Sequence, residues 1–146
     1  MREVKGNLWD YYDKGEWIVI TTNGTIKRNG ACVMGKGVAL EAKNRFPKLD
    51  KVLGAAISRF GNQLFVLRGI AGDVRIVTFP VKHNWNEKAD LTLIERSCRQ
   101  LEFVVREKSV VYMVRPGCGN GQLDWKDVKP ILEKYLDDRF VVVNND

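Results

Sequence analysis

Short apolar, β-branched runs alternate along this chain with longer segments whose apolar residues recur at helical spacing. Residues 17–22 are predicted to form a buried strand that ends at the turn Asn23-Gly24, and residues 140–143 a last strand of the same kind. Strands that are apolar on both faces are typical of sheets with helices packed on both sides. The alternation therefore predicts an α/β fold, a three-layer α/β/α sandwich.

The segments between these two strands divide into further helices and strands. Helices are expected at residues 38–46, at 49–60 with an apolar face, from the N-cap Asp90 onward, and at 125–135. Strands are expected at residues 63–68, 73–81 and 109–114, the first two joined by a glycine-containing turn. No repeat or linker interrupts the pattern, so residues 1–146 are predicted to be a single domain.

Composition narrows the class of protein. The chain has 146 residues, 45% of them hydrophobic and 29% charged, values typical of a folded domain. Lys and Arg number 24 and Asp and Glu 18, which gives a net charge of +6. This excess attracts polyanions such as nucleotides and nucleic acid, without specifying either of them.

The cysteines and the single histidine argue against a disulfide framework and a zinc site. Cys32, Cys98 and Cys118 are well separated and odd in number, and His83 is the only histidine. No apolar stretch is long enough to cross a membrane, and residues 1–5 carry no hydrophobic signal. We expect a soluble, cytoplasmic protein that needs no metal or cofactor and contacts no membrane.

Two glycine-rich runs each follow a strand-like segment and lead into a helix-like one. They are Gly35-Lys36-Gly37 and residues 117–121, Gly-Cys-Gly-Asn-Gly. Such loops present bare backbone N–H groups and the positive end of a helix dipole to an anion. Two of them in one small chain predict a ligand with two neighbouring phosphates, such as the pyrophosphate of a nucleotide-sugar.

The sequence also argues against a P-loop NTPase. Residues 30–36 satisfy G-x-x-x-x-G-K, but Gly37 stands where the Walker loop needs a Ser or Thr hydroxyl for magnesium. The strand at residues 109–114 is followed by Arg115-Pro116 and not by an acidic metal ligand. Phosphate binding without NTPase chemistry is therefore the prediction.

Taken together, these segments resemble a macrodomain, the ADP-ribose-binding α/β/α module with a mixed central sheet. The strings that carry the resemblance are Val4-Lys5-Gly6-Asn7-Leu8, Ile20-Thr21-Thr22-Asn23, Met34-Gly35-Lys36-Gly37-Val38-Ala39, Phe79-Pro80-Val81-Lys82 and Gly117-Cys118-Gly119-Asn120-Gly121-Gln122-Leu123-Asp124-Trp125. They are most similar to the branch that contains the terminal ADP-ribose protein glycohydrolase and the antitoxin that removes ADP-ribose from DNA. Phe-Pro-x-Lys followed by Trp85 is closest to the antitoxin type.

The resemblance implies a set of ADP-ribose contacts. Asn7 occupies a position where many relatives carry an Asp that binds adenine; the alternative is that Asn7 only caps a turn. Met34 and Val38 are expected to serve mainly in packing. The residues implied to bind ADP-ribose are Asn7, Leu8, Gly35, Lys36, Gly37, Val38, Gly117, Cys118, Gly119, Asn120 and Gly121.

The resemblance also implies that Lys82 is the catalytic residue at the distal ribose, assisted by Asn23. A lysine that acts as a nucleophile or base needs burial or a cationic neighbour to lower its pKa, and we expect His83, Arg115 and the cationic surroundings to supply the charge. Asn29 competes with Asn23, because the loop between Asn23 and Gly35 is longer than in the antitoxin pattern.

Two further positions bear on substrate and mechanism. Gly121 stands where the protein-directed glycohydrolase has a catalytic Asp, and Asp124 is predicted to cap the next helix instead. Lys27 and Arg28 lie in the longer loop, where they either grip an anionic target at the rim of the site or simply face solvent.

The function implied is hydrolytic removal of mono-ADP-ribose from a macromolecule, with nucleic acid favoured over protein as the acceptor. The alternatives are a phosphatase acting on ADP-ribose 1″-phosphate, a non-catalytic ADP-ribose reader, and a module that binds unmodified nucleic acid through its glycine loops. We expect a monomer, because no unexplained apolar stripe remains.

Overall fold

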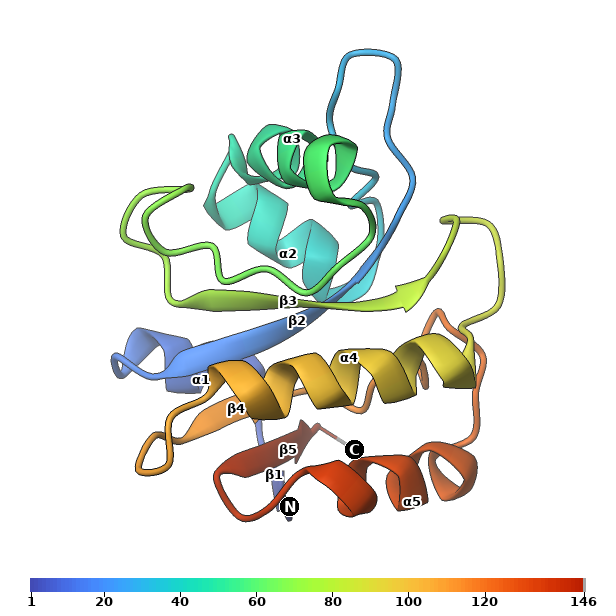
Figure 1. Ribbon diagram of the computed structural model, residues 1–146. Helices are drawn as coiled ribbons and strands as arrows, with labels where there is room; N and C mark the ends of the chain where they lie inside the picture. The colour runs from blue at the N-terminus through green and yellow to red at the C-terminus, as the bar shows by residue number, and fades with distance from the viewer. Residues whose placement is uncertain (146) are drawn as a thin grey trace.

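The computed structural model of the protein describes residues 1–145 as one sheet with helices on both faces (Figure 1). Among these residues, no helix is both long and apolar enough to cross a bilayer. The elements in chain order are β1 (Arg2–Lys5), α1 (Leu8–Asp13), β2 (Trp17–Asn23), α2 (Gly37–Arg45), α3 (Leu49–Phe60), β3 (Ile76–Lys82), α4 (Leu91–Val104), β4 (Val111–Met113), α5 (Trp125–Tyr135) and β5 (Phe140–Asn144).

The five strands lie in the order β1-β5-β4-β2-β3, and every neighbouring pair is parallel. The expected mixed character of the sheet is limited to one isolated antiparallel bridge, between Val66 and Val77 of β3. Apart from this bridge, the sheet is a parallel one.

The prediction of a strand at residues 63–68 is wrong, although this segment does run alongside β3. Leu67 donates its N–H to Ile76 O, and Thr78 donates to Phe65 O. The N–H of Phe65, however, donates to the Thr78 hydroxyl instead of to a backbone carbonyl, at 2.9 Å. This side chain interrupts the ladder, so a single bridge forms in place of a strand.

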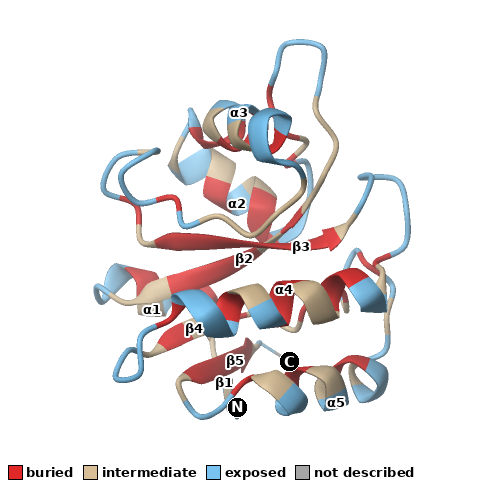
Figure 2. Ribbon diagram, viewed as in Figure 1, coloured by how far each residue is buried: buried red, intermediate tan, exposed pale blue. Residues whose placement is uncertain are grey.

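The residues of the strands alternate between two apolar cores, which confirms the three-layer sandwich. Ile18 and Ile20 pack with α1, α2 and α3, whereas Val19 packs with α4 and α5 on the other face. Figure 2 shows β2 and β3 buried along their length, with the helices buried on their inner sides only. The hydrophobic pattern of the strands is therefore explained by cover on both faces.

The helices begin and end close to the predicted residues. Asp90 caps α4 by accepting a hydrogen bond from Thr92 N at 2.9 Å. Asp124 occupies the N-cap of α5 as predicted, but its carboxylate accepts no capping hydrogen bond within residues 1–145 and lies 4.0 Å from Lys126 Nζ. The hydrophobic pattern did not predict α1, because its six residues complete less than two turns.

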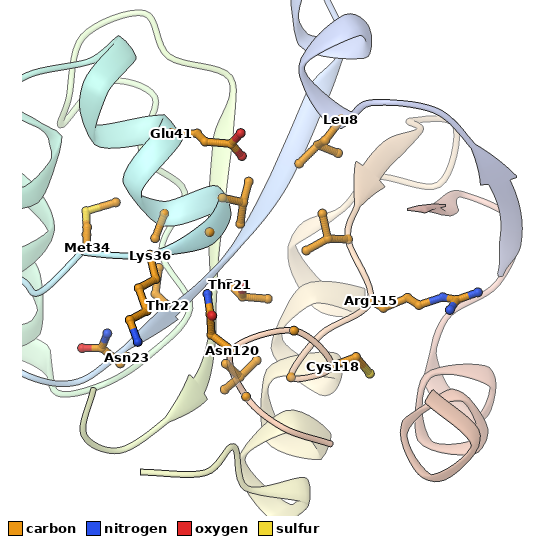
Figure 3. A pocket seen from close by; sticks show the side chains of 18 of the residues that line it. Leu8, Thr21, Thr22, Asn23, Met34, Lys36, Glu41, Arg115, Cys118 and Asn120 are labelled. Atoms are coloured by element: carbon orange, nitrogen blue, oxygen red, sulfur yellow. The ribbon is translucent and has the colours of Figure 1, made fainter. Parts of the chain in front are cut away.

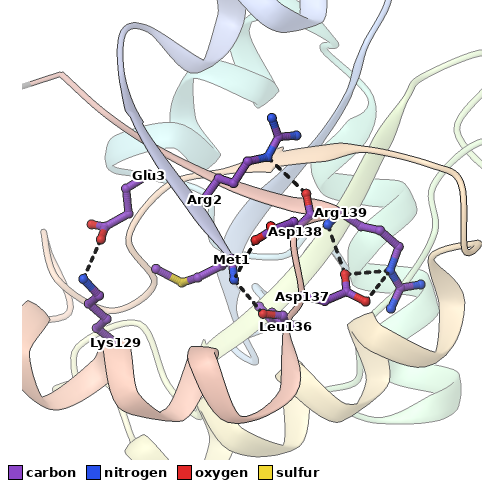
Figure 4. A network of polar contacts seen from close by, with 8 residues as sticks. All are labelled: Met1, Arg2, Glu3, Lys129, Leu136, Asp137, Asp138 and Arg139. Atoms are coloured by element: carbon purple, nitrogen blue, oxygen red, sulfur yellow. Dashed lines mark hydrogen bonds and ion pairs between the residues drawn. The ribbon is translucent and has the colours of Figure 1, made fainter.

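Polar contacts hold the edge strand β1 against α5 and β5 (Figure 4). The Glu3 carboxylate accepts hydrogen bonds from Lys129 Nζ at 2.7 Å and from Trp125 Nε1 at 3.0 Å. The bond from Lys129 is the main reason why the pKa of Glu3 lies below its ordinary value. The Met1 amino group donates to Leu136 O at 2.8 Å. These contacts keep a short, polar strand in register at the edge of the sheet.

The strand order reverses between β2 and β4. From β2 the chain passes through α2 and α3 on one face to β3, and from β4 it passes through α5 on the other face to β5. The carboxyl ends of β2 and β4 therefore lie side by side with connections that leave in opposite directions. Such a reversal leaves a crevice in which parallel α/β sheets bind ligands.

A hairpin at residues 24–33 follows β2 and rises beside α3 (Figure 1). Ile26 and Cys32 form an antiparallel bridge, and Cys32 N donates to Asp50 O of α3 at 2.8 Å. Gly54 of α3 lies directly beneath the hairpin: a Cβ atom there would be 1.9 Å from Gly30 O. The hairpin is thus docked on α3 at a point where only glycine has room.

We predict that Gly54→Ala destabilises the protein, although alanine ordinarily favours a helix by up to about 1 kcal/mol. The methyl group would collide with backbone, which cannot rotate away, and overpacking of this kind costs about 1–3 kcal/mol. Urea unfolding measures the change. Ala55→Gly on the exposed side of α3 is the control and should cost only the propensity difference. Increased stability of Gly54→Ala would contradict the docking of the hairpin.

Candidate functional site

A cleft of about 790 Å³ opens at the carboxyl edge of the sheet, where the strand order reverses (Figure 3). All of the residues predicted for the site line it: Asn7, Leu8, Asn23, Gly35, Lys36, Gly37, Val38, Lys82, Gly117, Cys118, Gly119, Asn120 and Gly121. Segments far apart in the sequence therefore meet in one cavity of the size typical of small-molecule sites.

The first glycine loop leads directly into α2. Lys36 is the N-cap of this helix, and within residues 1–145 its side chain makes no capping hydrogen bond. Gly37, Val38 and Ala39 form the first turn and line the cleft. The positive end of the α2 dipole and its uncapped N–H groups are thus available to an anion.

The second glycine loop faces the first across the cleft. It is held from behind, because Leu123 N donates to Gly117 O at 2.9 Å and Ala89 N to Gly121 O at 3.0 Å. The Asn120 carboxamide reaches toward α2: its Nδ2 atom lies 3.1 Å from where a Cβ on Gly37 would be. Figure 3 shows Asn120 pointing to the start of α2. The two loops therefore enclose a narrow passage.

Gly121 cannot be replaced by an acidic residue without a change in the loop. A Cβ at this position would lie 2.4 Å from Gly117 O, which belongs to the backbone of the same tight loop. The acid that is missing from the sequence here is thus also excluded by the geometry. Any hydrolytic chemistry in this cleft needs groups other than an acid at position 121.

The thiols do not contribute reactive groups. Burial raises the pKa of Cys118 to about 11 and that of Cys32 and Cys98 to about 12, so all three stay protonated. The Cys118 side chain turns away from the cleft, and its Sγ lies 3.5 Å from Pro116 O (Figure 3). Cys118 therefore offers its backbone to the cleft. Within residues 1–145, no group of three or more His, Cys, Asp or Glu side chains could hold a metal.

A β-bulge brings Lys82 and Asn23 together. Thr22 of β2 is in register with Pro80 of β3, but the next residue, Asn23, is in register with Lys82, so Val81 is an extra residue on β3. Pro80 has no N–H to donate, and its carbonyl accepts a hydrogen bond from Ser97 of α4 at 2.7 Å. The bulge places both predicted catalytic side chains at the same end of the cleft.

The surroundings of Lys82 lower its pKa below the ordinary value of a lysine. Burial is the larger cause, and the positive charge of Lys36 is the second. The Lys82 ammonium donates a hydrogen bond to Trp85 O at 3.2 Å. The backbone carbonyl of Lys82 accepts a hydrogen bond from the Asn62 side chain at 3.0 Å. Burial and the charge of Lys36 let Lys82 lose its proton more easily than a lysine in solvent, whereas the bond from its ammonium to Trp85 O favours the charged form.

His83 and Arg115, two of the cationic neighbours expected from the sequence, are not causes of the lowered pKa of Lys82. His83 Nε2 lies 2.8 Å from Asp90 Oδ2. Arg115 lies 3.8 Å from Glu3, stacks over Trp125, and points away from the cleft in Figure 3. His83 follows Lys82 in the sequence, and Arg115 lies just before the second glycine loop. The side chains of both residues nevertheless have partners elsewhere. Lys36, from the first glycine loop, supplies the charge instead.

Asn23 also organises the neck of the hairpin. Its Nδ2 donates to Val33 O at 2.9 Å, and its Oδ1 accepts a hydrogen bond from Thr25 N at 3.0 Å. The competing residue, Asn29, is at the hairpin tip, where its Oδ1 accepts a hydrogen bond from Ala31 N and does not line the cleft. Of the two asparagines, Asn23 lines the cleft and Asn29 does not, and the catalytic role of Asn23 stays a prediction.

Asn7 caps α1, as the alternative interpretation had it. Its Oδ1 accepts a hydrogen bond from Trp9 N at 2.9 Å. The side chain is nevertheless exposed at the cleft, and an amide oxygen has a second lone pair for a ligand. The capping role is therefore seen, and the adenine contact stays a prediction.

Sequence reasoning missed several lining residues. Thr21 and Thr22 form part of the floor at the end of β2, and Glu41 extends the wall of α2 one turn beyond Gly37. Glu41 accepts a hydrogen bond from Trp9 Nε1 at 3.4 Å. The spacing of four residues between Gly37 and Glu41 was a usable signal, because residues four apart share a helix face. The threonines lie in the string Ile20-Thr21-Thr22-Asn23 that carries the resemblance, and this string was the signal for them.

Comparison with known proteins supports the same interpretation. No protein-family model matches the sequence. The chain is 33% identical over 129 residues to a DNA ADP-ribosyl glycohydrolase of Mycobacterium tuberculosis, and 31% identical over 144 residues to one of Thermus aquaticus. These matches cover 83% and 94% of the chain but 37% and 38% of the relatives. The chain thus spans just over a third of the length of these curated relatives.

A solved structure extends the likeness to the whole fold. The macrodomain of Mycobacterium tuberculosis DarG superposes with a TM-score of 0.77 at 29% identity, over 97% of this chain and 95% of that one. The part of the relatives that this chain matches is therefore similar in sequence and in architecture.

We predict that Lys36→Gln raises the pKa of Lys82 toward the ordinary lysine value, because one of the two causes of its depression is removed. The pH dependence of Lys82 acylation, followed by peptide mass spectrometry, measures the change. Lys126→Gln on the outer surface of α5 is the control and should leave the Lys82 profile unchanged. An unshifted profile in Lys36→Gln would show that burial alone sets the pKa.

Proposed function

The chain belongs to the macrodomain family, and we propose that it binds ADP-ribose and removes it hydrolytically from DNA. The observation that carries the proposal is the pairing of Lys82 with Asn23 at one end of a cleft whose glycine loops suit a diphosphate. DNA is favoured as the acceptor because the relatives at 33% and 31% identity are named DNA ADP-ribosyl glycohydrolases.

The shape of the cleft suggests one orientation of the ligand. The adenosine half would lie against Asn7 and Leu8, and the pyrophosphate between the start of α2 and the loop at residues 117–121. The distal ribose would then reach Asn23 and Lys82. This orientation uses the two sets of backbone N–H groups for the two phosphates.

The chemistry would depend on the neutral form of Lys82. Its amine either attacks the anomeric carbon of the distal ribose or takes a proton from the water that does so. The bond from that carbon to the DNA base breaks, the base leaves with a proton, and the oxygen of water ends on the ribose. Asn23 would orient a ribose hydroxyl through the lone pair and the hydrogen of its amide that the hairpin leaves free.

We expect Lys82→Ala to lower the rate of ADP-ribose release from modified single-stranded DNA by about 10²–10⁴-fold, the usual contribution of one acid–base group. Calorimetric affinity for free ADP-ribose should stay near that of the wild type. Lys82→Arg is the matched control, because it keeps the positive charge but cannot act as a neutral amine. A protein adduct trapped by borohydride would identify Lys82 as the nucleophile. Turnover without such an adduct would identify Lys82 as the base.

Full turnover by Lys82→Ala would contradict the assignment of Lys82. Binding of ADP-ribose by the wild type without release from any adduct would instead indicate a reader, the alternative favoured by the lack of room for an acid at Gly121. Release of phosphate from ADP-ribose 1″-phosphate would identify the phosphatase.

A second experiment tests the backbone contacts. At Gly119, a Cβ atom would meet no atom within 4 Å from residues 1–145 other than its two chain neighbours, so packing among these residues does not explain this glycine. Close approach of a ligand explains it. We expect Gly119→Ala to weaken ADP-ribose binding about tenfold, roughly 1.4 kcal/mol, while leaving thermal stability unchanged or slightly higher. Unchanged affinity would contradict the placement of the ligand against the loop at residues 117–121.

We also propose that residues 1–146 act as one domain, monomeric, in a reducing cytoplasmic setting. All three cysteines are free, including the half-buried Cys118. Sedimentation of the protein with and without ADP-ribose tests the monomer.

A further inference from the structure

The structure points to a binding surface for the DNA strand beside the cleft, and we propose that it consists of Trp85 and the hairpin cations Lys27 and Arg28. The proposal rests on the proposed function. The proposed ligand is single-stranded DNA that continues from the modified nucleotide. The Trp85 indole would stack on a flanking base, and the two cations would bind backbone phosphates.

Trp85 is exposed at the mouth of the cleft, next to the group expected to carry out the reaction. It lines the cleft, and 53% of its surface is accessible to solvent. An indole in this position offers a stacking surface for an unpaired base, which suits single-stranded but not double-stranded DNA.

The backbone of Trp85 is fixed on both sides. Its N–H donates to the Thr25 hydroxyl at the neck of the hairpin at 2.9 Å, and its carbonyl accepts a hydrogen bond from the Lys82 ammonium at 3.2 Å. A further bond joins the two loops, from Gly24 N to His83 O at 3.2 Å. The backbone of Trp85 is thus held at a set place between the hairpin and the predicted catalytic lysine.

The hairpin presents its cations on a rigid support. Lys27 N donates to Ala31 O at 2.7 Å, and Gly30 N to Lys27 O at 2.9 Å, so the tip is a closed turn. The returning half of the hairpin, which contains Cys32, packs on α3 at Gly54. This contact fixes the direction of the hairpin. A preformed hairpin costs less ordering on binding than a mobile loop.

Lys27 and Arg28 have charges available for an external anion. Both are exposed, and no ion pair joins either of them to an acidic side chain within residues 1–145. Arg28 is three residues from Thr25, which places its Cα within about 10 Å of the Thr25 Cα along an extended chain. Trp85 N in turn lies 2.9 Å from the Thr25 hydroxyl. The span from Thr25 to Arg28 is comparable to a few nucleotide steps, about 3.4 Å each in stacked DNA. Phosphates that follow a base on Trp85 are therefore within reach.

The experiment compares two substrates: a short single-stranded oligonucleotide with one central ADP-ribosylated nucleotide, and the ADP-ribosylated nucleoside alone. The variant Lys27→Gln/Arg28→Gln removes the hairpin charges. Arg106→Gln/Lys108→Gln is the matched control, because it removes the same charge from the exposed turn before β4, at the other end of the strands. Release of ADP-ribose is measured as kcat/KM between about 50 and 200 mM salt.

Each phosphate contact with a single strand contributes about 0.7 to the slope of log kcat/KM against log salt concentration. Two contacts therefore predict that, across this range, kcat/KM falls about sevenfold more for the oligonucleotide than for the nucleoside. The hairpin variant should lose that extra dependence, and the control should keep it. Trp85→Ala should lower kcat/KM for the oligonucleotide at least about fivefold, with recovery in Trp85→Phe, since an aromatic ring restores stacking. The nucleoside should be cleaved equally by the wild type, the hairpin variant and the control variant.

Equal salt slopes in wild type and hairpin variant would overturn the DNA surface while leaving the hydrolase in place. The proposal would also be overturned if the hairpin variant lost as much kcat/KM on an ADP-ribosylated protein as on the oligonucleotide. A general electrostatic effect would then be sufficient to explain the loss. Failure of the wild type to release ADP-ribose from either DNA substrate would instead remove the proposed function, and this surface with it.

Discussion

The reversal of strand order between β2 and β4 is the constraint on which the site depends. The two neighbouring strands send their connections to opposite faces of the sheet, so neither connection covers the edge between them. The α2 helix begins at this edge, and the loop after β4 crosses it before α5. Both glycine loops therefore face one crevice, and their N–H groups converge there because the sheet is parallel.

A second constraint is the continuous set of contacts that links the predicted catalytic residues to the hairpin. The bulge at Val81 sets Lys82 opposite Asn23, and the Asn23 amide holds both strands of the hairpin neck. The hairpin in turn holds Trp85, whose carbonyl accepts a hydrogen bond from Lys82. Short hydrogen bonds thus join the end of the cleft to the neck of the hairpin.

Most of the fold was predictable from the sequence, because its elements are long, apolar and bounded by local signals. Asp90 at the start of α4 and the β-branched run of β2 are such cases. The failures have a different origin. Residues 63–68 are strand-like in composition, but a hydroxyl from Thr78, distant in the sequence, takes the hydrogen bond that a ladder needs. The short α1 helix depends on packing against the sheet more than on its own pattern.

The candidate site divides in the same way. The sequence by itself determined that both glycine loops lie at the cleft, since a glycine loop between a strand and a helix depends on local turn chemistry. Lys82 and Asn23 were expected there from the resemblance to macrodomains, and both line the cleft. The tertiary structure alone decided which charge acts on Lys82: Arg115 is turned toward Glu3, and Lys36 arrives from a different loop. It also decided that Gly121 has no room for a side chain. The physical reason is that Coulomb energy and steric exclusion depend on distances in space, which spacing along the chain does not specify.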